Sequence, residues 1–411
     1  MWFLNHPRPV SFINAQVVGE NGIVATSLRV EKGIITDLGE SPRQQDIQVN
    51  LDGAYIFPGL INAHDHLELN HYGKIKFREN YTNASYWTED VSSHLNSDAN
   101  LINGKSKPLS DRLFIGGIKN LLSGVTTVAH HNPFYRELQK NFPVHVVRDY
   151  GWAHSLYLQD GKAGANGEKP GNVLKKYKST PKNFPFIIHL AEGIDEFAQR
   201  EFQILKNLGC VGTNMVLVHG IGLSVDDWIS LTQLGGGLIW CPASNIFLIG
   251  KTISARQFLD SGCVENLALG SDSRLTGSRD LLEEMEQALN IGNVTAKEVF
   301  YMVTKNPAKL LRLPSAGKLS VGLPADLLII PAMHSDPFKT LSACSRKDIL
   351  LVTINGQPRY GSSELSDVFN VFKTKTASIQ VDGTNKQLSE PWASRLQKCS
   401  ISEAGVICLK N

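Results

Sequence analysis

The sequence predicts a (β/α)8 barrel, a TIM-like α/β fold, accompanied by a small β-sandwich domain built from both ends of the chain. In the middle of the chain, short apolar strands alternate with helical segments over about 250 residues, as is typical of this barrel. At both ends the pattern changes to short strands separated by turns, and neither end holds enough strand for its own core. We therefore expect residues 1–57 to form the first half of the β-domain, residues 58–313 the barrel, and residues 314–411 the second half and a tail.

The composition supports a large globular protein. A length of 411 residues suits one large barrel with an accessory domain, and 42% hydrophobic against 19% charged residues is typical of a chain with a sizeable core. The formal net charge is only +2, and no basic run or stripe is present. We therefore expect neither a nucleic acid nor a membrane surface as a partner.

The cysteines and the N-terminus predict a cytoplasmic location. The six cysteines are scattered without CxxC spacing, which in a chain of this size indicates reduced thiols. The first residues lack the charged segment and long apolar core of a secretion signal. No stretch of about 18 apolar residues is present, so no membrane span is expected.

The N-terminal part reads as hairpins followed by one buried strand. Residues 11–49 alternate in short runs with turns, and residues 55–61 form an apolar run broken by a Pro-Gly turn. This run leads into His64-Asp65-His66. Side chains alternate along a strand, so His64 and His66 point to the same face and can bind one metal ion. The pair alone is weak support for a metal site.

The next segments predict a lid and two further strands. Residues 67–110 read as a long polar loop, in which Trp87, Tyr86 and His71 can cover a substrate, although a solvated loop is the simpler interpretation. Residues 111–123 have helical spacing with an Asp cap. The strands at 125–129 and 144–150 follow, and these are succeeded by two pairs of candidate pocket residues: His130 and His131, then Trp152 and His154.

Strands are easier to recognise in the second half of the barrel sequence than in its middle. Residues 153–185 contain no clear strand, so the fourth of eight strands is expected there. Four apolar strands then alternate with helices, at residues 186–189, 215–219, 237–241 and 266–272. From residue 317 the pattern returns to short strands, at 325–331 and 349–354.

Chemically active side chains end several of these strands. His189, His219 and Asp272 come last in three apolar strands, and Glu192 follows His189 by three residues. The active sites of characterised barrels lie at this end of the strands. We therefore expect these side chains to converge with His64 and His66 on the barrel axis.

A series of motifs in order resembles the amidohydrolase superfamily over nearly the whole chain. The likeness includes HLAE at 189–192, which is similar to the family's HxxE, and the single His219 of the sixth strand. The other matching segments are PGLINAHDH (58–66), GVTT (124–127), CPASN (241–245), GSDS (270–273), NPA (306–308) and the GKL…GLPADL segment (317–327). HxxE with one sixth-strand His resembles the mononuclear branch, which includes cytosine, guanine and S-adenosylhomocysteine deaminases and triazine hydrolases.

The resemblance implies a metal centre. In that branch one divalent ion, zinc or iron, is bound. By the resemblance its ligands here would be His64, His66, His189 and Asp272. The binuclear branch bridges two metals through a carboxylated lysine on the fourth strand. Here the candidates Lys175 and Lys176 lie in a polar, helix-like stretch, so a single metal is favoured.

The resemblance also implies roles for the remaining residues. A metal-bound water loses a proton near neutrality, Glu192 carries that proton to the substrate, and His219 donates a hydrogen bond to the developing oxyanion. Asp272 would orient the water as well as bind the metal. The candidate substrate contacts are His130, His131, Trp152, His154 and Trp87, each of which can instead be a packing residue.

These inferences predict a hydrolase in which a metal-bound hydroxide attacks an amidine or amide carbon of a small ring-containing molecule. Deamination with release of ammonia is the leading reaction, and hydrolysis of a cyclic amide or imidazolone-like ring is the alternative. A catalytically inactive barrel used as a binding scaffold is a third interpretation, against which the complete ligand set argues. The expected partner is a small-molecule substrate, and a homodimer is left open.

Overall fold

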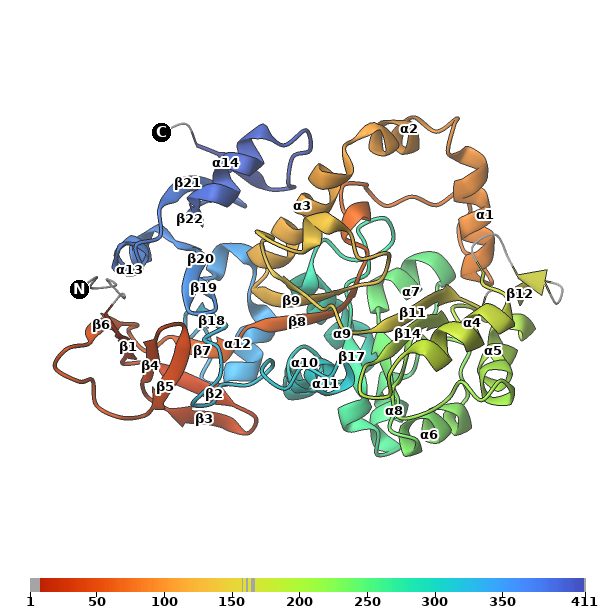
Figure 1. Ribbon diagram of the computed structural model, residues 1–411, viewed down its shortest axis with the longest axis horizontal. Coiled ribbons are helices and arrows are strands. Elements are labelled where there is room, and N and C mark those ends of the chain that lie inside the picture. The colour runs from red at the N-terminus through yellow and green to blue at the C-terminus, as the bar shows by residue number, and fades with distance from the viewer. Residues whose placement is uncertain (1–7, 157, 160–161, 164–166, 410–411) are drawn as a thin grey trace.

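The computed structural model describes residues 8–156, 158–159, 162–163 and 167–409. A barrel fills one side of the molecule and a β-rich part the other, where both ends of the described chain lie (Figure 1). A three-stranded and a five-stranded parallel sheet together supply the eight barrel strands. These are β8 (Leu60–Asp65), β9 (Val125–His130), β10 (His145–Val146), β11 (Gly151–Ser155), β14 (Phe186–Leu190), β15 (Met215–His219), β16 (Gly237–Trp240) and β17 (Leu267–Leu269).

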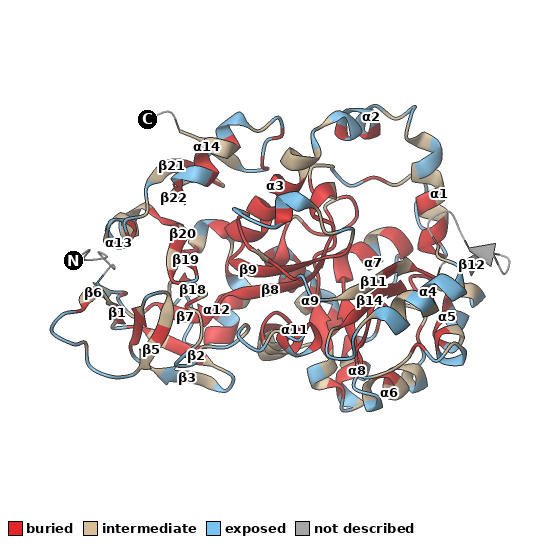
Figure 2. Ribbon diagram, in the orientation of Figure 1, coloured by how far each residue is buried: buried red, intermediate tan, exposed pale blue. Residues whose placement is uncertain are grey.

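Helices cover the outside of these strands. They are α3 (Leu109–Leu122), α4 (Pro170–Ser179), α5 (Glu196–Asn207), α6 (Val225–Gln233), α8 (Ala255–Asp260), α9 (Leu281–Gly292), α10 (Ala296–Met302) and α11 (Lys305–Leu310). Most barrel strands are buried along their whole length, whereas the helices bury one face only (Figure 2). The prediction of a (β/α)8 barrel is confirmed.

The fourth strand lies slightly earlier than expected. It is β11, which begins at residue 151 and pairs in parallel with β14, with Gly151 opposite Phe186. Trp152 and His154 therefore lie within a strand, whereas the sequence predicted that they follow one. The strand is hard to recognise because it alternates small, aromatic and polar residues and is only partly buried.

Strands from both ends of the chain form the β-domain beside the barrel. A four-stranded sheet has the order β5-β4-β1-β6, and a nine-stranded sheet has the order β23-β21-β22-β20-β19-β18-β7-β2-β3. The N-terminal strands are β1 (Val10–Ile13), β2 (Gln16–Gly19), β3 (Gly22–Ala25), β4 (Leu28–Glu31), β5 (Ile34–Leu38), β6 (Ile47–Asn50) and β7 (Tyr55–Pro58). The C-terminal strands are β18 (Leu327–Ile330), β19 (Leu351–Ile354), β20 (Gln357–Ser362), β21 (Thr376–Val381), β22 (Thr384–Ser389) and β23 (Val406–Cys408). β7 and β18 pair antiparallel, with Tyr55 opposite Ile330, which confirms the sandwich built from both ends.

The apolar run at 55–61 is two strands instead of one. β7 belongs to the nine-stranded sheet and β8 to the barrel, and Gly59 separates them. The Gly59 N–H donates to the carbonyl of Asp326 at 2.8 Å, and Leu60 N–H to that of Gly124 at 3.0 Å. A Cβ at position 59 would lie 2.2 Å from the Thr126 side chain, so this crossing point requires glycine.

Three segments contain more structure than the sequence predicted. The presumed loop at 67–110 holds η1 (Leu67–Leu69), α1 (Ala84–His94) and α2 (Ala99–Ser106), with Asn83 and Asp98 capping the two helices. The segment that follows β16 is a helix, α7 (Pro242–Ile249), and the tail contains α14 (Glu390–Lys398) between β22 and β23. The helices α1 and α2 have weak apolar periodicity, because they arch over one end of the barrel instead of packing on its sides (Figure 1).

Shorter elements complete the described chain. They are β12 (Leu158–Gln159), β13 (Lys162–Ala163), α12 (Pro337–Ala343), α13 (Ser366–Val371), η2 (Arg136–Leu138), η3 (Val264–Asn266), η4 (Arg346–Asp348) and η5 (Ser363–Leu365). Among the described helices, none combines the length and the apolar character needed to cross a membrane. All six cysteines are described, and none forms a disulfide.

Four charged side chains, three of them buried, join the C-terminal tail to the barrel. The Glu403 carboxylate accepts two hydrogen bonds from Arg274, at 2.9 and 2.5 Å, and one from Arg346 at 2.7 Å. Arg346 also donates to Asp280 at 2.6 Å, and Asp280 caps α9. Because removal of one partner would leave a buried charge uncompensated, this network depends on the ionised state of both carboxylates.

We expect this network to make the protein acid-sensitive. Burial alone would raise the pKa of Asp280 and Glu403, but the neighbouring arginines outweigh burial and lower both pKa values. A carboxyl whose pKa is lowered by folding stabilises the protein above its unfolded pKa of about 4, and this contribution is lost as the pH falls through the folded pKa. The free energy of unfolding, measured by urea titration, should therefore fall by on the order of 2 kcal/mol between about pH 5 and pH 2. The Asp280→Asn variant should show a shallower fall, and an equal slope would contradict the assignment.

Candidate metal centre and active site

Three imidazoles from two strands meet inside the barrel. His64 lies at the end of β8 and His66 directly follows this strand, while His189 comes from the end of β14. The Nε2 atom of His189 lies 3.2 Å from that of His64 and 3.3 Å from that of His66. All three side chains are buried, and their ligand atoms lie within 4.8 Å of one another.

A carboxylate completes this group. Asp272 follows β17, and its Oδ1 lies 3.8 Å from Nε2 of His66 and 4.0 Å from Nε2 of His64. Its backbone N–H donates to the His64 carbonyl at 3.1 Å, which ties the ends of the two strands together. The hydroxyls of Ser244 and Thr276 donate to Oδ2 at 2.8 and 3.0 Å.

The electrostatics of the group suit a divalent cation. Burial lowers the pKa of His64 and His189 well below 6.5, so both rings are neutral. Burial alone would raise the pKa of Asp272, but the nearby histidines and the Ser244 hydroxyl lower it, so this carboxylate is ionised. His189 Nδ1 lies 2.7 Å from the His154 carbonyl and donates to it, so its Nε2 carries a lone pair. A divalent cation next to this lone pair and the Asp272 carboxylate would be coordinated by both.

Glu192 and His219 flank the imidazoles. Oε2 of Glu192 lies 3.6 Å from Nε2 of His219, whose Nδ1 lies 2.8 Å from Oδ1 of Asn245. The turn that carries Glu192 into the site is formed by Ala191, which has a φ of +55°. His219 itself has a φ of +72°, and Asp272 has a φ of +50°. Left-handed backbone is costly at residues other than glycine, and such strain concentrates at functional sites.

These groups form the floor of a cavity of about 320 Å³. His66, His189, Asp272, Glu192 and His219 line one end of it. The walls come mainly from the segment 67–101, from α7 and from the loop after β17. The wall residues are Leu69, Tyr72, Trp87, Thr88, Val91, Ser92, Leu95, Leu101, Asn132, His154, Leu248, Ser273, Leu275 and Thr276.

Two of the five candidate substrate contacts, Trp87 and His154, line this cavity. His131 lies behind the metal group, where its ring stacks on His189 with centroids 4.2 Å apart and its Nε2 lies 2.9 Å from the Ala153 carbonyl. Trp152 packs edge-on against His131. His130 is fully buried, and its Nδ1 accepts from the N–H of Leu67 at 3.3 Å. These last three side chains support the cavity from behind and do not line it.

Several cavity residues were missed by the sequence analysis. Asn132 follows the two histidines at the end of β9, and its amide donates to Glu68 at 2.5 Å. Ser273 and Thr276 follow Asp272 in the same loop, and the motif around Asp272 pointed to this loop. The apolar wall residues of α1 and α2 could not be recognised, because their segment reads as a solvated loop.

The lysines considered as bridging ligands lie elsewhere. Lys175 and Lys176 are in α4, on the outer surface of the barrel. The Lys176 ammonium pairs with Glu168 at 2.7 Å and lies over the Trp152 ring. No lysine is among the described residues that line the cavity of the metal group.

The barrel with a histidine–aspartate centre at the carboxyl ends of its strands defines the class of metal-dependent barrel hydrolases. The chain belongs to the amidohydrolase family, whose model matches residues 173–378. It is therefore an enzyme that hydrolyses carbon–nitrogen bonds, in agreement with the sequence analysis.

Curated relatives extend this likeness over most of the chain. The 5-methylthioadenosine/S-adenosylhomocysteine deaminase of Pyrococcus furiosus is 25% identical over 349 residues, which cover 75% of this chain and 82% of the relative. The protein of the same name from Haloquadratum walsbyi is 24% identical over 381 residues, covering 77% and 82%.

Solved structures share the fold. An adenosine deaminase from Xanthomonas campestris with bound zinc has a TM-score of 0.68 at 16% identity, covering 89% of this chain and 97% of that one. The triazine hydrolase from Arthrobacter aurescens has a TM-score of 0.70 at 18% identity, covering 89% and 98%. At these identities the likeness establishes the barrel architecture alone.

Proposed function

We propose that this protein is a deaminase that uses one divalent ion, zinc or iron, to release ammonia from a small ring-containing substrate. The observation that carries the proposal is the convergence of three buried imidazoles and a carboxylate beside Glu192 and His219, at the floor of one cavity. The deaminase names of the curated relatives favour the same reaction. Water adds to the carbon that bears the amino group, the carbon–nitrogen bond breaks, and ammonia leaves.

His64, His66, His189 and Asp272 would hold the ion. A bound divalent ion supplies a water molecule whose pKa is lowered towards neutrality. Ser244 and Thr276 hold Oδ2 of Asp272 at 2.8 and 3.0 Å, which leaves Oδ1 facing the imidazoles. These hydrogen bonds orient the carboxylate, as the partners of metal ligands commonly do.

Glu192 would move the protons. Its carboxylate lines the cavity beside the imidazoles and lies 3.6 Å from Nε2 of His219, so it would exchange a proton there without serving as a ligand. It would take a proton from the attacking water, deliver it to a ring nitrogen, and deliver the second proton to the departing amino group. Each proton that leaves the water thereby ends on the product or on ammonia.

His219 would stabilise the oxygen that develops negative charge. Oδ1 of Asn245 fixes the ring by accepting from Nδ1 at 2.8 Å. The opposite nitrogen faces Glu192 and the cavity, and it donates to the oxygen when the ring carries both protons. We expect His219→Asn to lower kcat by about 10²-fold, because one preorganised donor is lost. Metal content should be unchanged, as should the activity of a His145→Asn control whose ring lies at the other end of β9 and β10 and pairs with Asp326. An unchanged kcat would exclude this role, and loss of metal would make His219 a ligand.

The cavity favours a substrate with an uncharged, apolar end. Among the described residues that line it, charged carboxylates occur only at the floor, and the opposite walls carry aromatic and aliphatic side chains. A zwitterionic amino acid group there would lose its hydration without gaining a charged partner. We therefore propose an uncharged aminated heterocycle with an apolar substituent, so that 5′-methylthioadenosine fits better than S-adenosylhomocysteine.

The experiment combines elemental analysis with ammonia release on a panel of compounds. The panel contains 5′-methylthioadenosine, S-adenosylhomocysteine, an aminotriazine and a cyclic amide. We expect about one zinc or iron per chain, and a kcat/KM at least about tenfold higher for an uncharged aminated ring than for S-adenosylhomocysteine. Ring opening without ammonia would replace deamination by cyclic-amide hydrolysis. Absence of bound metal and of any turnover would make the scaffold interpretation the better one.

A further inference from the structure

The Asn70 side chain connects the backbones of two metal-binding segments. Its amide donates to Asp65 at 2.8 Å and to the carbonyl of His66 at 3.2 Å. Its Oδ1 accepts from Lys119 at 2.7 Å, and the same ammonium donates to the carbonyl of Asp272 at 3.0 Å. Asn70 and Lys119 are buried, so these hydrogen bonds are not in competition with bulk water.

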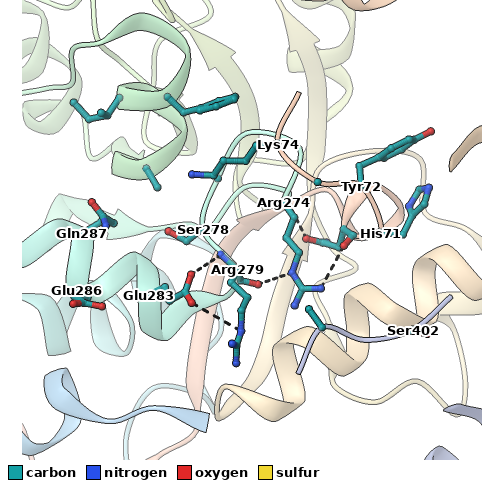
Figure 3. A pocket seen from close by; sticks show the side chains of 17 residues that line it. His71, Tyr72, Lys74, Arg274, Ser278, Arg279, Glu283, Glu286, Gln287 and Ser402 are labelled. Atoms are coloured by element: carbon teal, nitrogen blue, oxygen red, sulfur yellow. Dashed lines mark hydrogen bonds and ion pairs between the residues drawn. The ribbon is translucent and has the colours of Figure 1, made fainter. Parts of the chain in front are cut away.

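Arg274 holds the other side of Asn70. Its backbone N–H donates to Oδ1 of Asn70 at 3.2 Å, and its guanidinium donates to the Asn70 carbonyl at 3.4 Å and to the Arg279 carbonyl at 2.8 Å. Figure 3 shows Arg274 between the segment that carries His71 and Tyr72 and the tail residue Ser402, at the edge of a cavity of about 730 Å³. Arg274 is also only two residues from Asp272, so its position constrains that strand end.

Glu403 fixes the guanidinium from the tail. Both of its oxygens accept from Arg274 in a two-pronged arrangement, and the side chain has no solvent exposure. Such a fork specifies the plane and the position of the guanidinium, which a single contact would not. A hydrogen-bonded path therefore runs from Glu403 through Arg274 and Asn70 to the backbone of His66.

We propose that Glu403 is a positioning residue for the metal centre: through Arg274 it holds Asn70, and with it the backbone of His66 and Asp272, in the arrangement that binds the ion. This inference rests on the proposed metal site. The tail thereby acts on the centre from outside the barrel, although none of its described residues lines the cavity of the metal group. Arg346, the second partner of Glu403, donates to Asp280 at 2.6 Å, and within the described part of the chain no hydrogen bond joins it to Asn70.

The test compares the zinc affinity of three variants of the full chain by competition with a chromophoric chelator, which needs no substrate. Glu403→Gln removes the charge, and Arg274→Lys keeps the charge but loses the fork. Both should bind zinc about 10-fold more weakly, and kcat at saturating zinc should fall as well. The matched control, Arg346→Gln, breaks the same network on the far side of Glu403. It should lower Tm while its zinc affinity stays within about 3-fold of wild type.

The combined variant Arg274→Lys/Glu403→Gln separates a shared path from two independent effects. If Glu403 acts through Arg274, the combined loss of zinc affinity should not exceed the larger single loss. Additive losses, wild-type affinity in Glu403→Gln, or an equal loss in Arg346→Gln would each overturn the proposal. If Glu403→Gln fails to fold, the comparison of zinc affinity between Arg274→Lys and Arg346→Gln tests the proposal by itself. A wild-type chain that binds no zinc or iron would instead refute the metal site itself.

Discussion

The His66→Ala variant is expected to purify with far less than one metal ion per chain and to release no measurable ammonia. His66 Nε2 lies 3.3 Å from that of His189 and 3.8 Å from Oδ1 of Asp272, at the centre of the donor group. Removal of this imidazole takes away one of four donors, and the three that remain were arranged around the missing nitrogen, so they should hold the ion much more weakly. Without the ion, the pKa of the attacking water would rise from near neutrality to that of bulk water, so turnover should fall by more than about 10³-fold.

Elemental analysis and a coupled ammonia assay measure both effects. The matched control is His145→Ala, which removes an imidazole from the opposite end of the barrel strands, where it pairs with Asp326 at 3.4 Å. Its side chain is 41% exposed, so the fold should tolerate the change. Retention of a full metal complement and of turnover in His66→Ala would refute the assigned centre, and loss of metal in the control would make the effect unspecific.

The convergence of these side chains was predictable because neighbouring strands of a parallel barrel end at the same edge. His189 and His219 each end an apolar strand, and the ends of adjacent strands are neighbours, as the pairing of Leu190 with His219 illustrates. Alternation along β8 likewise places His64 and His66 on one face. These inferences require only the strand boundaries and the rule that all barrel strands point the same way.

Prediction was weaker where the chain leaves a strand. His130, the last residue of β9, and the next residue, His131, share neither a face nor a role that alternation can assign. His131 stacks on His189, whereas His130 receives a hydrogen bond from Leu67. The lid helices α1 and α2 were likewise missed, since their apolar residues face a cavity and produce little periodicity.

The contribution of the tail depends on contacts that no local pattern reveals. Glu403 and Arg274 are separated by 129 residues in sequence, and nothing around either residue marks it as part of an ion pair. The pairing follows only from how the tail packs against the loop after β17. Long-range polar contacts of this kind need coordinates, because a charged residue in isolation reads as solvent-exposed.

The Glu192→Gln variant should keep its metal and lose most of its activity. Glutamine has nearly the shape of glutamate but cannot accept and release a proton, so kcat should fall by about 10³-fold, within the range for loss of a general acid–base group. Because Glu192 faces His219 and is not one of the four proposed ligands, the metal content should stay at the wild-type level. This separates it from His66→Ala, in which metal and activity disappear together.

The control for this variant is Glu196→Gln, four residues further on. Its carboxylate lies in the first turn of α5, is 80% exposed and pairs with Arg200 at the surface, so kcat should be unchanged. A kcat within about 3-fold of wild type in Glu192→Gln would assign proton transfer to another group. A fall in kcat with parallel loss of metal would instead make Glu192 a ligand. A lower kcat with the metal retained is the outcome expected for a proton carrier, because the residue that transfers the proton is then distinct from the residues that bind the ion.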